Sequence, residues 1–109
     1  MNQEIKTKWV AALRSGEYTQ AKGKLKIEES FCCLGVLCDL HSKEKTIEWN
    51  KELYLEATGM LPEAVKEWAN IDSSNGNPVI INKKSQTLAW HNDENSTFLE
   101  IADAIENQL

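Results

Sequence analysis

The sequence lacks a long apolar run: no stretch approaches the roughly 18 apolar residues that a membrane-spanning helix needs. Residues 1–6 are mostly polar or charged, so they also lack the apolar segment of a secretory signal peptide. These two absences predict a protein that has no membrane partner and that works in the cytoplasm.

Cysteine is scarce as well. The chain has only Cys32, Cys33 and Cys38, an odd number confined to seven residues of apolar sequence. Small secreted domains usually spread an even number of cysteines along the chain, so this pattern indicates free thiols in a reducing compartment. On a helix, Cys33 and Cys38 would point about 140° apart, and only His41 would share a face with Cys38. A structural zinc site needs four convergent ligands, so we expect core cysteines, no metal and no other cofactor.

The size and composition of the chain predict one domain with one core. It has 109 residues, of which 41% are hydrophobic and 27% charged. A core this small leaves no room for a large internal cavity. A site is therefore expected on the surface, in a loop-lined groove, or between protomers of a homo-oligomer. The predicted fold class is α+β: a single domain over residues 1–109, with about four helices around a buried central helix and a small antiparallel sheet.

Apolar periodicity places the elements around that central helix. An amphipathic helix is predicted over residues 3–15, ended by Gly16, which takes the left-handed conformation easily. Leu25 and Ile27 alternate with lysines, which predicts a strand with one wet face. Residues 97–100 form a capping box that starts the last helix. The other predicted elements are a hairpin of residues 46–49 and 53–55, a short helix with Pro62 in its first turn, exposed turns over 72–78 and 83–85, a strand over 79–81, and a strand or helical turn over 87–90.

Residues 31–41 are predicted as the central helix, capped by the side chain of Ser30. Only the sector that holds Gly35 and Asp39 lacks an apolar side chain, and a helix that is apolar all round is a buried one. Gly35 lowers helix stability by about 1 kcal/mol relative to alanine, so a close backbone contact is expected on its face. Asp39 needs a partner, because an unpaired buried carboxylate is costly. Arg14 or a lysine of the N-terminal segment is the expected partner.

The charge is distributed unevenly along the chain. Residues 1–26 hold six basic and two acidic residues, hence a net charge of +4, whereas the rest carries −9 and the total is −5. An acidic protein is poorly suited to general DNA binding, which depends on neutralising phosphates. A local basic patch can still receive a small anion, although solvated lysines are the ordinary explanation.

The candidate ligand-binding site lies in this basic N-terminal quarter. Arg14, Lys22 and Lys24 supply cationic donors, Gln20 supplies an amide, and Tyr18 supplies a flat ring. Such side chains suit a phosphate-bearing nucleotide. The free amides at the start of the central helix would add an anion site.

Thiol catalysis is the enzymatic alternative. Cys32 and Cys33 would lie in the first turn of a helix, where the amide dipoles favour a thiolate, and His91 could approach as a base. The flanking leucines indicate burial instead. No glycine-rich phosphate loop or Ser/His/Asp arrangement occurs, so the sequence favours a non-catalytic protein.

The most distinctive stretch is Phe-Cys-Cys-Leu-Gly-Val-Leu-Cys-Asp-Leu at residues 31–40. Together with residues 12–20, 61–69 and 98–106, it resembles a family of small phage and prophage accessory proteins with a helix of the FCCLGVLCDL type. Similar proteins tend to have Leu-Asn-Asp where this chain has Trp-His-Asn-Asp at residues 90–93.

The resemblance implies an accessory protein that acts in the cytoplasm of the host cell, and it transfers no catalytic residues. Small phage proteins of this kind often act as counter-defence factors, by soaking up a nucleotide signal or by blocking a defence protein. The leading expectation is sequestration of a phosphate-bearing nucleotide signal by the basic N-terminal site. The alternative is stoichiometric inhibition of a host protein, with Trp49, Tyr54 or Trp90 as aromatic anchors.

Overall fold

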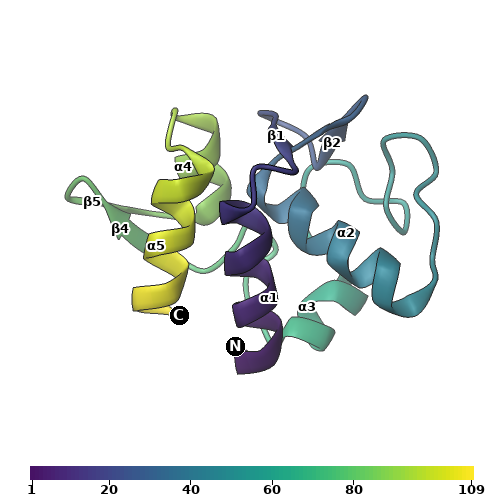
Figure 1. Ribbon diagram of the computed structural model, residues 1–109, viewed down its shortest axis with the longest axis horizontal. Coiled ribbons are helices and arrows are strands. Elements are labelled where there is room, and N and C mark those ends of the chain that lie inside the picture. The colour runs from purple at the N-terminus through teal and green to yellow at the C-terminus, as the bar shows by residue number, and fades with distance from the viewer.

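Helices make up most of the regular structure. The computed structural model describes residues 1–109 (Figure 1) and confirms the α+β class and the single domain. Five helices are formed: α1 (Gln3–Arg14), α2 (Cys33–Lys45), α3 (Glu63–Ala69), α4 (Leu88–Asp93) and α5 (Phe98–Gln108). None of them is long and apolar enough to cross a bilayer.

The central helix α2 is buried along its first half, as predicted. Every residue from position 33 to position 38 is buried. The helix starts two residues later and ends four residues later than expected. The predicted cap was wrong, because the sulfur of Cys32 accepts the Gly35 amide while Ser30 belongs to a strand.

A close backbone contact explains the glycine of this helix. A Cβ atom built on Gly35 would lie 1.8 Å from the carbonyl oxygen of Leu25. The same oxygen accepts the Cys32 amide at 3.1 Å. The segment before α2 therefore lies directly on the helix, and the prediction of a close approach is confirmed.

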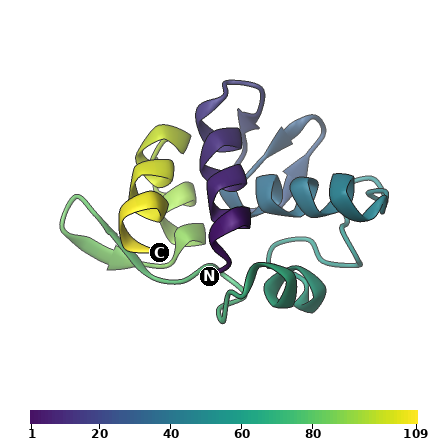
Figure 2. The ribbon, with the colours of Figure 1, turned by 60° about the horizontal axis from the view of Figure 1, so that its bottom comes forward.

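Helices α1 and α5 lie side by side, and α1 lies between α5 and α2 and packs against both (Figures 1 and 2). The Trp9 ring of α1 is fully buried, and its indole nitrogen donates to the Cys33 carbonyl at 3.0 Å. Helix α5 begins with the predicted capping box of Thr97 and Glu100. Gly16 ends α1 with a φ of 79°, also as predicted.

The strands are short and form two separate sheets. β1 (Thr19–Gln20) pairs in parallel with β3 (Ser30–Phe31), which pairs antiparallel with β2 (Lys26–Ile27). β4 (Val79–Ile81) and β5 (Lys84–Gln86) form an antiparallel hairpin. The sequence pattern predicted that Leu25 and Ile27 both face the core. Leu25 is buried, but Ile27 is exposed to solvent.

Three other predicted elements differ in detail. Residues 88–90, left open between strand and helix, belong to α4. Pro62 stands at the N-cap of α3 instead of inside its first turn. The predicted hairpin over residues 46–55 is wrong: this segment has only isolated bridges that join Asn50 to Leu53 and Tyr54 to Ala57.

Candidate functional site

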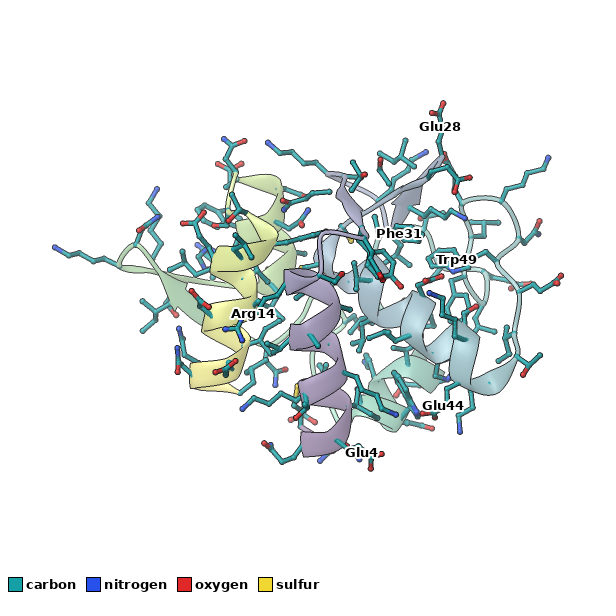
Figure 3. The ribbon with its side chains drawn as sticks, viewed as in Figure 1. Glu4, Arg14, Glu28, Phe31, Glu44 and Trp49 are labelled. Atoms are coloured by element: carbon teal, nitrogen blue, oxygen red, sulfur yellow. The ribbon has the colours of Figure 1, made fainter.

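Two of the predicted cationic ligand residues are paired with carboxylates. Arg14 reaches across to α5, where its guanidinium lies 2.6 Å from Asp103 and 2.5 Å from Glu106 (Figure 3). The Lys24 ammonium lies 3.2 Å from Glu52. An incoming phosphate would have to displace these carboxylates.

Two more predicted residues are bonded to the segment around the α4–α5 turn. Gln20 donates its amide to Asn92 Oδ1 at 2.9 Å and to the Ser96 carbonyl at 2.8 Å. The Lys22 ammonium donates to the side chain of Asn95. These hydrogen bonds hold β1 and the residue after Ala21 against the end of α4 and the turn that precedes α5. Both side chains therefore have a structural role.

Tyr18 binds Asp39, the one charged residue on the buried half of α2. The phenol donates to Asp39 Oδ2 at 2.6 Å, and the Trp49 indole donates to Asp39 Oδ1 at 3.0 Å. Lys43 completes the cluster at 3.3 Å. Burial, aided by the nearby carboxylate, raises the pKa of Tyr18 to about 12. The predicted pairing of Asp39 with Arg14 or an N-terminal lysine was therefore wrong.

The expected anion site at the start of α2 is filled by the protein itself. The Cys33 amide donates to Asn92 Oδ1 at 3.1 Å, and the Gly35 amide donates to Cys32 Sγ at 3.3 Å. Asn92 and both cysteines are buried. The five predicted ligand residues thus point to different partners, and the structure does not gather them around a common space.

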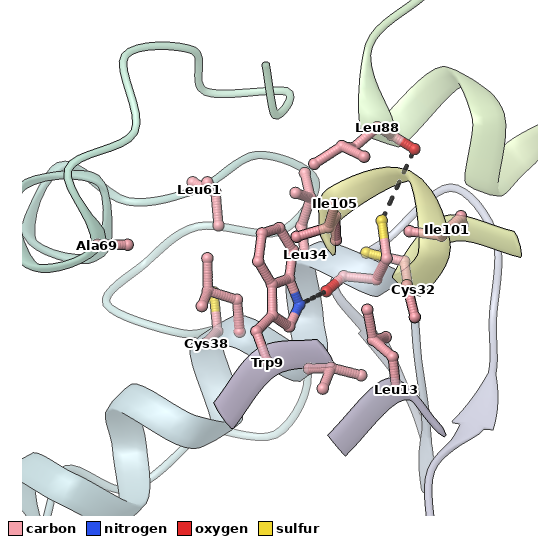
Figure 4. Close-up of a cluster of buried hydrophobic side chains, with 14 of the residues drawn as sticks. Trp9, Leu13, Cys32, Leu34, Cys38, Leu61, Ala69, Leu88, Ile101 and Ile105 are labelled. Carbon is pink, nitrogen blue, oxygen red and sulfur yellow. Dashed lines mark hydrogen bonds between the residues drawn. The ribbon is translucent and has the colours of Figure 1, made fainter. Parts of the chain in front are cut away.

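The cysteines lie in the core (Figure 4). Burial raises the pKa of Cys32 to about 11 and raises the pKa of both Cys33 and Cys38. The Cys33 thiol donates to the Leu88 carbonyl at 3.7 Å, and His91 Nε2 lies 2.9 Å from the carbonyl of Val79. This geometry supplies neither a thiolate nor a free imidazole, so it gives the thiol-enzyme alternative no support.

The thiols are therefore expected to be unreactive in the folded protein. With Ellman's reagent at pH 8, all three should react at least about 100-fold more slowly than in urea, because only an exposed thiolate attacks. Rapid labelling of any one thiol in the native protein would contradict this placement.

A different surface stands out, on the segment that joins α2 to α3. Residues 46–60, which we call the 46–60 loop, run beside β2 at the right of Figure 1. The Leu25 amide donates to the Thr58 carbonyl at 2.6 Å, and Glu52 accepts the backbone amide of Glu28 at 3.1 Å. These contacts fix the loop against the strand.

Aromatic side chains of the loop pack against α2 and β3. Tyr54 is fully buried, and its phenol oxygen lies 2.6 Å from His41 Nδ1 on α2. Trp49 packs against Tyr54 at 5.0 Å and against Phe31 at 5.7 Å between ring centroids (Figure 3). Tyr54 is thus part of the core and is not available as the surface anchor that we expected. Trp49 and Trp90 are half-buried and remain accessible.

The largest depression on the surface lies on this loop. It has a volume of about 580 Å³. The 46–60 loop and the neighbouring β2 also carry exposed apolar side chains: Ile27 is 37% exposed, Leu55 42% and Met60 54%. Only two other large apolar side chains in the chain are as exposed, Ile80 and Leu99. The depression is lined by Lys24, Asn50, Lys51, Glu52, Leu53 and Thr58.

Sequence reasoning missed this surface. It assigned Leu55 to a strand and treated Ile27 as an inward residue, and no regular pattern marks Met60. The only available indication was the failure of residues 42–59 to fit either helical or strand periodicity.

The chain belongs to the family described as "Domain of unknown function (DUF8296)", whose model matches residues 1–109. Searches of curated proteins and of solved structures each found no match.

Proposed function

We propose that this DUF8296 member is a non-catalytic, phage-type accessory protein that antagonises a host defence system by binding stoichiometrically to a host protein. The proposed contact surface, which we call the recognition face, consists of the 46–60 loop and β2. The observation that carries the proposal is that three of the five exposed large apolar side chains belong to these two segments: Ile27, Leu55 and Met60. Extensive exposed apolar surface is typical of protein-binding sites.

The backbone of the recognition face supports the same reading. Lys51, Leu55 and Glu56 adopt positive φ values of 56°, 49° and 69°. Each costs about 1–2 kcal/mol for a residue with a side chain. Such strain persists where the surrounding structure enforces it, and it concentrates at binding sites. A loop already held in shape also loses less entropy when it binds.

Charge indicates the chemistry of the partner. Glu28 and Glu29 at the tip after β2, and Glu48 and Glu56 in the loop, are exposed and form no salt bridge. Lys26 and Lys51 on the same face also form no salt bridge, so the unpaired charge there is four acidic residues against two basic ones. Such an excess of acidic side chains complements a partner surface that carries basic groups.

Charge-introducing substitutions on the recognition face test this proposal. The double variant Leu55→Glu/Met60→Glu should lose a host protein that co-purifies with the wild-type chain, with affinity reduced about 100-fold or more, because central apolar anchors dominate binding. Quantitative mass spectrometry of tagged protein isolated from bacterial cells measures the loss.

The chain offers a matched control for this experiment. Ile80→Glu/Leu99→Glu changes two equally exposed apolar residues on β4 and α5 and should retain the partner. Retention by both double variants, or equal loss by both, would contradict the assignment of the recognition face.

One observation favours nucleotide sequestration as a second candidate. Lys26 forms no salt bridge, and its ammonium lies 5.4 Å from the Phe31 ring centroid and 5.3 Å from that of Trp49. Phe31 is buried, but Trp49 is half-buried, and a cation without a salt bridge beside such a ring suits a phosphate and a base together. Calorimetric titration with a panel of nucleotides separates the candidates: heat that disappears in Lys26→Glu would support sequestration over protein binding.

A further inference from the structure

The β4–β5 hairpin projects from the end of the molecule opposite the 46–60 loop (Figures 1 and 2). The two residues of its turn, Asn82 and Lys83, have φ values of 52° and 67°, as in a type I′ hairpin turn. In the register that this turn fixes, Ile80 of β4 stands opposite Ser85 of β5. Such a hairpin has two outer edges, and the protein covers only one of them.

The outer edge of β4 is closed by a side chain of α5. The backbone amide of Ile80 donates to Gln108 Oε1 at 2.6 Å, and Gln108 Nε2 donates to the Ile80 carbonyl at 2.8 Å. A side-chain amide has the same donor and acceptor groups as a peptide unit, so Gln108 takes the place of a neighbouring strand. Because both backbone groups of Ile80 point away from β5, its pair with Ser85 is a non-hydrogen-bonded one.

The outer edge of β5 is open. In a non-hydrogen-bonded pair the backbone groups of both residues point outward, so the N–H and C=O of Ser85 face away from β4. Two positions further on, the backbone is still extended at Thr87, with φ −63° and ψ 159°, and the Thr87 amide has no backbone acceptor. All three residues of β5 are exposed. An unpaired edge of this kind is a template for another strand.

The charge beside the open edge is of one sign. Lys83 and Lys84 form no salt bridge. Residues 73–92 contain no aspartate or glutamate, although the net charge of the chain is −5. The Lys84 ammonium lies 5.7 Å from the centroid of the half-buried Trp90 ring. A strand added here would meet two cations beside an aromatic ring, so acidic side chains would suit it.

We propose that the outer edge of β5 is a strand-addition site, which takes an extended acidic segment of a partner protein as the third strand of this sheet. Main-chain hydrogen bonds to Ser85 and Thr87 hold the segment. Carboxylates beside Lys83 and Lys84 select it. Because the edge is short, the contact is weak and reversible.

The charges also decide between possible occupants. A second copy of the chain fits less well, because β5 paired with another β5 would place four lysines along one short ladder. The recognition face has an excess of unpaired acidic residues, whereas this edge has only unpaired lysines. The two surfaces therefore suit different partner segments, and the strand-addition site goes beyond the proposed function.

Titration with designed peptides, followed by nuclear magnetic resonance, tests the site. The probe is a synthetic peptide of about eight residues in which glutamate alternates with valine. It should bind saturably, with the largest shifts at the amides of residues 84–87, and should slow the exchange of the Ser85 amide at least about tenfold. A peptide with lysine in place of glutamate, or the acidic peptide with methylated backbone nitrogens, should bind at least about tenfold more weakly.

Variants of the chain locate the binding. Lys83→Glu/Lys84→Glu should weaken binding of the acidic peptide at least about tenfold. The control Lys6→Glu/Lys51→Glu makes the same change in net charge at two other lysines without salt bridges, and it should bind like the wild type. Ser85→Pro removes the outward N–H but leaves the ladder to β4 intact, and it should also lose the peptide.

Four outcomes would overturn the inference: no saturable shift, shifts that centre outside β5, equal binding of the acidic and basic peptides, or binding that Ser85→Pro leaves unchanged. Should Ser85→Pro fail to fold, the methylated peptide answers the same question on the wild-type chain. Shifts in β5 that depend on protein concentration alone would place a second copy at the edge and would also overturn it. Leu55→Glu/Met60→Glu should bind the acidic peptide like the wild type, so failure of this site and failure of the recognition face are distinguishable.

Discussion

The variant Gly35→Ala should lose about 4 kcal/mol or more of its free energy of unfolding, which is a large part of the total stability of a domain this size. The added methyl group would lie 1.8 Å from the carbonyl oxygen and 2.7 Å from the carbonyl carbon of Leu25. Both are backbone atoms, so no side-chain rotation relieves the clash. Alanine gains about 1 kcal/mol of helix propensity over glycine, but the clash is much the larger effect.

Urea denaturation followed by circular dichroism measures this loss. Gly59→Ala is the matched control, because its Cβ would meet only the Gly23 carbonyl oxygen at 3.7 Å, an ordinary contact. The control should be neutral, or stabilised by up to about 1 kcal/mol. A Gly35→Ala variant as stable as Gly59→Ala would show that Leu25 does not lie on α2.

Replacing Asn92 by leucine should cost about 3 kcal/mol. The Asn92 side chain is fully buried and joins three segments. Its Oδ1 accepts hydrogen bonds from the backbone amide of Cys33 and from the side-chain amide of Gln20. Its Nδ2 donates to the Ala21 carbonyl at 2.8 Å. Leucine has a similar volume but no polar atoms, so the Cys33 amide and the Ala21 carbonyl would be left buried without partners, at about 1–3 kcal/mol each.

The same denaturation experiment measures this effect. Asn107→Ala is the control: that side chain is exposed on α5 and bonds only the Asp103 carbonyl of its own helix, so it should change stability by less than about 0.5 kcal/mol. If Asn92→Leu were equally harmless, the Asn92 side chain on α4 could not be the structural junction described here.

Local chemistry was sufficient to predict four of the five helices, all except α4. The apolar stripe of α1, its end at Gly16 and the capping box at Thr97 are decided by neighbours within one or two turns. The burial of α2 followed from the apolar side chains around its circumference. The glycine at position 35 predicted a close backbone contact on its face of the helix. These predictions needed no knowledge of which distant segments meet.

The partners of the charged residues could not be predicted in this way. Arg14 pairs with Glu106, 92 positions along the chain, and Lys24 pairs with Glu52. In the sequence, both residues belong to a basic segment that resembles an anion site. Only the packing of α1 on α5, and of the 46–60 loop on β2, brings the neutralising carboxylates to them.

The recognition face was hidden for a related reason. Ile27 and Leu55 look like core residues by composition, yet both are exposed, and left-handed turns occur beside or at them, at Glu28, Leu55 and Glu56. No glycine or asparagine marks these turns, so turn preferences gave no indication of them. The loop keeps its shape because Tyr54 is held beneath it, which is a tertiary interaction.

Native mass spectrometry of the chain, isolated without denaturation from the bacterial cells that produce it, tests most directly whether the protein acts by binding a host protein. The account predicts a complex with one host protein in a fixed whole-number ratio, with no nucleotide attached, that disappears for Leu55→Glu/Met60→Glu and persists for Ile80→Glu/Leu99→Glu. A chain that carries a nucleotide and no protein, or a complex indifferent to both double variants, would contradict it.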